Sequence, residues 1–337
     1  MGWLETHVAE IWFLIIGFFV LYYAVADGVD LGVGMIALFT PDEGQRGLMM
    51  ASLQSMWQDN QTWLVVLGGM LFGAFPLFYS VILSAFYVPI IVMLFGLVFR
   101  GIAFEFRDRA RNARPWSLSF GLGSLVVALS QGMTLGSIFH GMPMDGHTFT
   151  GSIWSWLHPY SVLFTVGVVS GYIMLGANYL IMKNSGSMQA RNRVNSRFAS
   201  ISMLLVAIAI YAWTITQHPY IARKWATMPD LLHVSFFPLL ALAAYVLYLR
   251  SLHLGRELAP LLWNMAAVFC AFIGISVGFY PYIIPNMMTI QSAAVSSPNT
   301  LIFMLAMIAI LLPLILAYIA YKHWIFRGKV SSGRYED

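Results

Sequence analysis

Long apolar runs alternate with short polar segments along this chain, and the runs set the predicted architecture. An α-helix needs about 20 apolar residues to cross the hydrocarbon core of a bilayer. Runs of about this length recur along the whole sequence, with turn residues or charges between them. The pattern predicts nine transmembrane helices, over residues 10–39, 57–80, 83–106, 116–139, 158–182, 195–216, 229–250, 259–281 and 300–326.

A shorter helix is predicted between the first two spans. Thr40 can cap a helix, Pro41 suits its first turn, and Glu43 follows three residues after Thr40, as in a capping box. Residues 41–55 therefore form either a short interfacial helix or an extension of the second span.

Composition supports a membrane protein. Hydrophobic residues make up 59% of the 337 residues and charged residues only 9%, whereas soluble domains average about 25% charged residues. So few charges cannot cover a water-soluble globule. We expect residues 1–337 to form a single all-α, polytopic integral membrane domain. The sequence shows no nucleic-acid-binding surface.

The basic residues predict the orientation in the membrane. If the nine spans are correct, all but two of the 18 Lys and Arg residues fall on one side. The opposite side has only Arg223 and Lys224. Because cytoplasmic loops carry an excess of Lys and Arg, we expect the N-terminus outside and the C-terminus in the cytoplasm. This prediction counts Arg46 and Arg100 among the basic residues of the cytoplasmic side.

Two acids lie inside the first predicted span. Asp27 and Asp30 are three residues apart, so they share one face of a helix. Each costs about 2.5–3.5 kcal/mol near the bilayer centre, which favours a buried or hydrated site, and we assign both to a proton pathway. The alternative is that they are merely solvated near the end of a long tilted helix. Gly28 and Gly32 predict close contact with a neighbouring helix.

Polar and indole side chains open the second span. Trp57 and Trp63 flank Asp59, Asn60 and Gln61. We predict that Trp57, Trp63 and Asn60 bind a quinone or lipid head group, and that Asp59 joins the proton pathway. The alternatives are that the rings are ordinary interface anchors and that the polar residues only cap the helix.

Neither a metal site nor a catalytic residue is predicted. The eight His residues lie in loops or near predicted helix ends without a paired ligand motif, and the 20 Met residues fit packing roles. Glu105 has Arg109 four residues on and Arg100 five residues back, which favours a surface ion pair there. The single Cys270 can form no intrachain disulfide.

Four blocks of this sequence stand out together: Asp27 to Gly34, Trp57 to Trp63, Gly68 to Pro76 and Phe99 to Arg107. In their order and spacing they resemble subunit II of the cytochrome bd-type quinol oxidases. The likeness covers the whole hydrophobic chain and is closer to the cyanide-insensitive branch.

One position departs from that family's pattern, which usually reads Trp-Asp-x-Asn-Glu/Gln. Here Gln58 takes the acidic position and the acid, Asp59, comes one residue later. On a helix this displacement turns the carboxylate by about 100°.

The resemblance implies a fold of two four-helix bundles plus a peripheral helix, in a bacterial or archaeal cytoplasmic membrane. It implies a partner, subunit I, that carries haems b558, b595 and d, and possible single-helix accessory subunits. The complex would oxidise quinol and reduce O2 to water electrogenically. This chain would ligate no haem, stabilise subunit I, and carry a proton path and a bound quinone or lipid.

Two other functions fit parts of the sequence. Intramembrane Asp residues and Gly-interrupted helices also occur in secondary transporters, although no internal repeat is visible here. A haem protein with His and Met ligands on this chain is the third interpretation.

Overall fold

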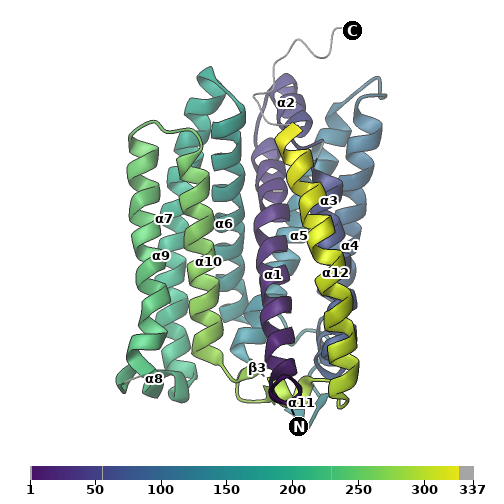
Figure 1. Cartoon of the computed structure of the whole chain (residues 1–337). Helices are drawn as coiled ribbons and strands as arrows, with labels where there is room; N and C mark the ends of the chain where they lie inside the picture. The colour runs from purple at the N-terminus through teal and green to yellow at the C-terminus, as the bar shows by residue number, and fades with distance from the viewer. Residues whose placement is uncertain (1, 55, 229, 326–337) are drawn as a thin grey trace.

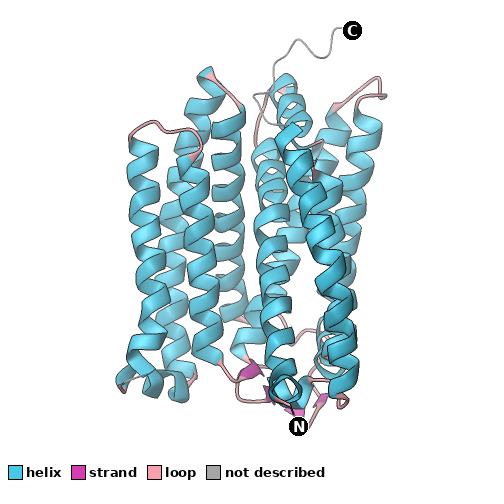
Figure 2. Cartoon of the chain, in the orientation of Figure 1, coloured by secondary structure: helices cyan, strands magenta, loops and turns pink. Residues whose placement is uncertain are grey.

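The computed structural model describes residues 2–54, 56–228 and 230–325 and is helical almost throughout (Figures 1 and 2). The helices are α1 (Trp3–Leu38), α2 (Glu43–Leu53), α3 (Trp57–Ala74), α4 (Pro76–Arg107), α5 (Arg114–His140), α6 (Pro159–Lys183), α7 (Gly186–Gln217), α8 (Pro219–Ala226), α9 (Asp230–His253), α10 (Ala259–Phe279), α11 (Ile290–Ala293) and α12 (Pro298–Ile325). Two small antiparallel hairpins pair β1 (Met144–Asp145) with β2 (Thr148–Phe149) and β3 (Tyr282–Ile284) with β4 (Met288–Thr289).

Eight helices in the described part of the chain are long and apolar enough to cross a membrane, which confirms a polytopic all-α membrane protein. They are α1, α4, α5, α6, α7, α9, α10 and α12. The second predicted span is the helix α3, which is 18 residues long and packs along α1. α3 is not counted among the eight membrane-spanning helices because its polar first turn lowers its mean hydropathy.

The long helices form two bundles and one outlying helix, as the resemblance implied. α1, α3, α4 and α5 pack together, and α6, α7, α9 and α10 form the second group (Figure 1). α12 lies outside both groups, along α1 and α3 (Figure 1). α1 and α5 both contact α6, and these contacts join the two bundles.

Backbone contact between α1 and α6 makes this junction close. A Cβ atom added at Gly32 would lie 1.8 Å from the carbonyl oxygen of Tyr172, and one added at Gly176 would lie 2.4 Å from the carbonyl carbon of Gly32. Only glycine fits at either position. The prediction of close helix contact through the glycine stripe of α1 is therefore confirmed.

The boundary between the second and third spans was predicted wrongly. The chain breaks at Phe75 (φ −129°, ψ 62°), and Pro76 begins α4, rather than residues 81–82 forming the break. Proline suits a first helical turn because its missing N–H has no partner to lose there. A second bend occurs inside α4 at Phe86 (φ −121°, ψ 22°), three residues before Pro89. Pro89 cannot donate a helical hydrogen bond, which explains the bend.

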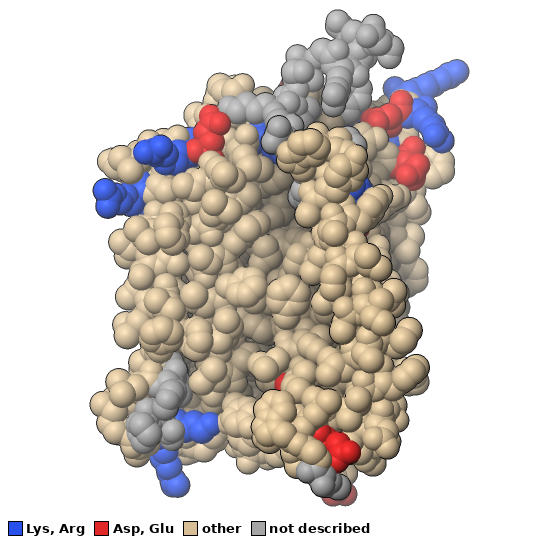
Figure 3. Space-filling model, viewed as in Figure 1, with Lys and Arg blue, Asp and Glu red and all other residues tan. Residues whose placement is uncertain are grey.

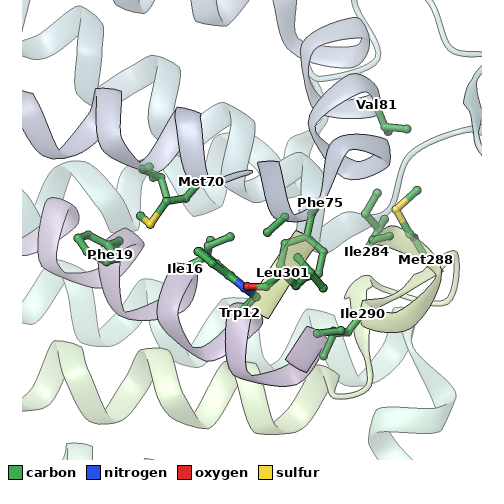
Figure 4. Close-up of a cluster of buried hydrophobic side chains, with 14 of the residues drawn as sticks. Trp12, Ile16, Phe19, Met70, Phe75, Val81, Ile284, Met288, Ile290 and Leu301 are labelled. Atoms are coloured by element: carbon green, nitrogen blue, oxygen red, sulfur yellow. The ribbon is translucent and has the colours of Figure 1, made fainter. Parts of the chain in front are cut away.

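A hydrophobic cluster holds α12 against the first bundle (Figure 4). Trp12, Phe19, Phe75 and Leu301 are buried in it, and the indole nitrogen of Trp12 donates to the carbonyl oxygen of Leu301 at 3.0 Å. Residues of the β3–β4 hairpin and α11 complete the cluster (Figure 4). α12 is therefore fastened both by apolar packing and by a buried hydrogen bond.

Basic side chains gather at one end of the molecule. Figure 3 shows most of the visible Lys and Arg at the top, where α1 and α4 end, with a smaller group at the bottom. Arg223 and Lys224 lie in the last turn of α8, which is at the lower end of the molecule (Figure 1). We call the upper end the basic end. Arg100 was wrongly counted there: it lies inside α4 and is fully buried.

The predicted short helix exists as α2, but its cap was assigned to the wrong residue. Asp42 is the N-cap, and its side chain accepts a hydrogen bond from the backbone N–H of Gln45 at 2.7 Å. Thr40 instead donates to the carbonyl oxygen of Ile36 at 2.8 Å and closes the end of α1. Arg46 of α2 donates to the carbonyl oxygens of Ala37, at 3.1 Å, and Thr40, at 2.7 Å. A cation is thus placed at the negative end of the α1 dipole.

Glu43 ties α2 to the neighbouring helices. Its carboxylate accepts from Arg46 and Arg107, each at 3.2 Å, and from the hydroxyl of Ser117. Burial alone would raise the pKa of Glu43, but the hydrogen bonds from Ser117, Arg107 and Arg46 outweigh it and lower the pKa below 4.5. Glu43 is therefore ionised at neutral pH and joins α2, α4 and α5 at the basic end.

Candidate functional site

A fully buried ion pair joins α1 to α4. The Nη2 and Nη1 atoms of Arg100 lie 3.0 and 3.3 Å from the two carboxylate oxygens of Asp27, and neither side chain is exposed. The hydroxyl of Tyr23, one turn before Asp27, donates to the same carboxylate at 2.9 Å. Such a pair compensates two charges that could not otherwise remain in the interior.

Hydrogen bonds extend this pair across the junction of the two bundles. The side-chain amide of Gln131, in α5, donates to the Tyr23 hydroxyl at 2.9 Å. The hydroxyl of Tyr172, in α6, donates to the amide oxygen of Gln131 at 2.6 Å. One polar network, which we call the Asp27 network, therefore runs through α1, α4, α5 and α6.

Asp30 lies on the same face of α1 but in different surroundings. It is fully buried, and its Oδ2 atom accepts from the side-chain amide of Asn60 at 2.9 Å. The Asn60 amide also donates to the carbonyl oxygen of Ala26 at 3.3 Å. Among the described residues, the Oδ1 atom of Asp30 has no hydrogen-bond partner. Within the part of the chain that the structure describes, Asp30, unlike Asp27, forms no ion pair, and a protonated carboxyl there would have one oxygen free to bond elsewhere.

Asp59 does not join the other acids. Its Oδ2 atom lies 2.5 Å from the Nζ atom of Lys322 in α12, with both side chains about a quarter exposed. Asn60, the next residue, faces α1 instead. The two side chains point about 100° apart around α3, so the residue that reaches Asp30 is the amide and not the acid.

The two tryptophans at the start of α3 are buried against aromatic neighbours. Trp57 is stacked on Phe104 with ring centroids 4.8 Å apart. Trp63 lies 5.2 Å from Phe19 and 5.0 Å from Tyr22 by the same measure. Only 8% of Trp57 and 3% of Trp63 is exposed. Both rings therefore pack inside the protein, and the prediction that they bind a quinone or lipid head group with Asn60 stays a prediction.

Sequence reasoning missed four members of the Asp27 network: Arg100, Tyr23, Gln131 and Tyr172. Of the two basic residues considered for a surface ion pair with Glu105, Arg109 and Arg100, the second does not form it, because its guanidinium turns inward to Asp27. A signal was present, since Arg100 lies seven residues before the end of α4, almost two helical turns. A cation so far inside a span generally faces a buried partner.

The histidines give no metal centre within the described residues, where no group of three or more His, Cys, Asp or Glu side chains is placed to hold a metal ion. His140 and His158 stack at the end opposite the basic end, with ring centroids 3.8 Å apart. His218 approaches the carbonyl oxygen of Phe139 through its Nε2 atom at 3.0 Å. These contacts are packing and hydrogen bonding between loops and helix ends.

The fold and the buried network define a polytopic helical membrane protein that keeps ionisable groups between its helices. Comparison with known proteins refines this class. The chain belongs to the family of cytochrome bd terminal oxidase subunit II, whose family model matches residues 8–326. The resemblance drawn from the four sequence blocks is thereby confirmed, and the transporter interpretation is not favoured.

Curated relatives agree over most of the chain. Cytochrome bd-I ubiquinol oxidase subunit 2 of Escherichia coli K12 is 26% identical, covering 95% of this chain and 94% of the relative. A probable cytochrome oxidase subunit 2 of Haemophilus influenzae is 25% identical over 96% of this chain and 95% of its own. Cytochrome bd ubiquinol oxidase subunit 2 of Bacillus subtilis is 29% identical, over 60% of this chain and 61% of the relative.

A solved structure shows the same fold. The bd oxidase from Geobacillus thermodenitrificans superimposes with a TM-score of 0.77 at 19% identity, covering 94% of this chain and 98% of the matched chain. Together with the family assignment, this makes the chain one subunit of a quinol oxidase complex in a bacterial membrane. The family implies that the haems belong to the partner subunit I.

Proposed function

We propose that this chain supports subunit I of the oxidase while the complex oxidises quinol and reduces O2 to water. Haems b558, b595 and d would all lie in subunit I, and single-helix accessory subunits would complete the assembly. The relatives from E. coli and B. subtilis are named as ubiquinol oxidase subunits, which supports quinol as the electron donor. Proton uptake from the cytoplasm would make the reaction electrogenic.

The proposed orientation places the N-terminus outside and the basic end in the cytoplasm. The gathering of Lys and Arg at the basic end supports it (Figure 3), because positive charge is retained on the cytoplasmic side of membrane proteins. In this orientation Asp30 lies eight residues before the cytoplasmic end of α1 at Leu38. That separation corresponds to a depth of about 12 Å.

We further propose that Asp30 carries protons through this chain. The observation that supports it is the contrast between the two buried acids. Asp27 is held by Arg100, whereas among the residues that the structure describes Asp30 bonds only to the Asn60 amide, through one oxygen, and its other oxygen has no partner. A carboxyl that is buried without a cation can exist in the neutral form and exchange its proton with water. Asp27 would then act as the fixed counter-ion of Arg100, and Asp59 would stay outside the path.

Asp30→Asn tests the proposal, because it keeps the size of the side chain but cannot ionise. In a fully assembled, haem-replete complex it should slow O2 reduction and proton uptake together by about tenfold. This corresponds to an activation free energy of proton transfer raised by about 1.4 kcal/mol. Asp59→Asn is the matched control, since it makes the same change outside the path and should leave turnover near the wild-type rate.

Assembly has to be measured in the same samples, from haem content and subunit ratio. An Asp30→Asn complex that assembles and matches the wild-type rates of turnover and proton uptake would show that Asp30 is not in an obligatory proton path. Loss of assembly without a change in turnover per haem would mean that Asp30 only fastens α3 to α1.

A further inference from the structure

A groove separates the end of α1 from α6 and α7, away from the Asp27 network. Its volume is about 380 Å³, within the size range of small-ligand sites. α7 supplies Arg191, Asn195, Phe198 and Ser202, and Phe39, directly after α1, lines the opposite side. The four α7 residues are spaced by three or four, so they form one continuous face of the helix.

The groove is as long as one leaflet of a membrane is deep. Eleven residues separate Arg191 from Ser202 on α7, which corresponds to about 16 Å along the helix. Half of a hydrocarbon core is about 15 Å thick. The rim is apolar and open, since Phe39 and Phe198 are 72% and 70% exposed. At the deep end the groove is lined by the uncharged side chains of Ser170 and Ser202, whose hydroxyls bond to each other at 2.8 Å.

The positive charge at the shallow end comes from Arg191, which lines the groove. Arg193, two residues further along α7, donates instead to the carbonyl oxygens of Leu252 and Gly255. Arg191 is half-buried there, and among the described residues its side chain donates only to the carbonyl oxygen of Phe39, at 3.3 Å. A guanidinium has five N–H donors, so most of them remain available to an anion. Asn195, one turn deeper, adds an amide on the same face.

We propose that this groove binds one anionic phospholipid from the leaflet at the basic end. The phosphate would lie at Arg191 and Asn195, and one acyl chain would follow Phe198 toward Ser202. The apolar length fits an acyl chain, and the guanidinium of Arg191 selects an anionic head group over a zwitterionic one. The groove lies beside the junction of α1 with α6, so a bound lipid would help to hold the two bundles together.

Lipid binding to the purified, delipidated oxidase complex tests the proposal. We would titrate the complex with dioleoylphosphatidylglycerol or dioleoylphosphatidylcholine and count the bound lipids by native mass spectrometry. Arg191→Gln should weaken phosphatidylglycerol binding about fivefold, equivalent to about 1 kcal/mol for one juxtamembrane charge. Arg197→Gln is the matched control, because it removes the same charge six residues along α7 from an exposed position outside the groove.

A second variant tests the acyl-chain part without changing any charge. Ala199→Phe places a ring in the groove, between Asn195 and Ser202, and should remove this lipid whichever head group it carries. If Ala199→Phe fails to assemble, the comparison of Arg191→Gln with Arg197→Gln still decides. Equal binding of phosphatidylglycerol by those two variants would overturn the proposal. So would extraction of a quinone, or contact of another subunit with Phe198 by cross-linking, in place of the phospholipid.

Discussion

Removing Arg100 should be among the most damaging single changes to this protein. In the wild-type protein Arg100 and Asp27 are both fully buried, with nitrogen–oxygen distances of 3.0 and 3.3 Å. Arg100→Gln deletes the cation and leaves the carboxylate of Asp27 buried without it. Two unit charges about 4 Å apart attract by about 4 kcal/mol at an effective dielectric constant of 20. Removing one partner of a buried pair costs about 3–5 kcal/mol, because the other charge stays buried.

The double variant provides the critical comparison. Asp27→Asn alone leaves Arg100 unpaired and should cost a similar amount. Combining Asp27→Asn with Arg100→Gln removes both charges and leaves two amides that can bond to each other. We expect the double variant to be less destabilised than either single variant, with an interaction energy of about 3 kcal/mol, at the upper end of what neighbouring residues show.

The assay is thermal unfolding of the complex in lipid nanodiscs, with haem content as the measure of assembly. The pair of Asp59 with Lys322 is the control, because it is shorter, at 2.5 Å, yet about a quarter exposed on both sides. Solvent screening should limit the cost of Lys322→Gln to about 1 kcal/mol or less. The reasoning would be refuted if Arg100→Gln were no worse than Lys322→Gln, or if the double variant cost the sum of its two single variants.

Two further results are expected. Gly32→Ala should destabilise the chain by about 1–3 kcal/mol through overpacking, because the added Cβ would lie 1.8 Å from the carbonyl oxygen of Tyr172. Gly69→Ala is the control: its Cβ would meet nothing within 4 Å, so it should be neutral or slightly stabilising in the same unfolding assay. The lowered pKa of Glu43 should give stability that is complete above pH 4.5 and lost as the pH falls through the folded-state pKa. Glu43→Gln should remove this part of the pH dependence. If the variant and the wild-type protein showed the same dependence of unfolding temperature on pH across the acidic range, the expectation would be contradicted.

The spans followed from the sequence because each depends on local information, whereas the two bundles were expected only from the family resemblance. Apolar length marks a transmembrane helix wherever it packs, and the glycine stripe of α1 marks a close contact without naming the partner. The break at Phe75 was misplaced because apolar residues continue on both sides of it. Pro76 was the better signal, since proline begins helices and does not depend on hydropathy.

The site was only partly predictable, because it depends on which helix faces cross. Asp27 and Asp30 stand out as acids within an apolar run. Nothing local indicates that Arg100 pairs with Asp27, 73 residues away, instead of with the nearer acid Glu105. Asp59 and Asn60 are adjacent in sequence, and both suited a polar site. Only the rotation of α3 against α1 decides that the amide meets Asp30 and the acid meets Lys322.

The hydrogen bond from Trp12 to Leu301 joins residues that the ribosome makes far apart in time. They are 289 positions apart, and at a synthesis rate of about 5–20 residues per second the acceptor appears roughly 15–60 seconds after the donor. Over that interval the indole N–H needs another acceptor, since an unsatisfied buried donor costs about 1–3 kcal/mol. The cluster around Trp12 can therefore be completed only after α12 has been made.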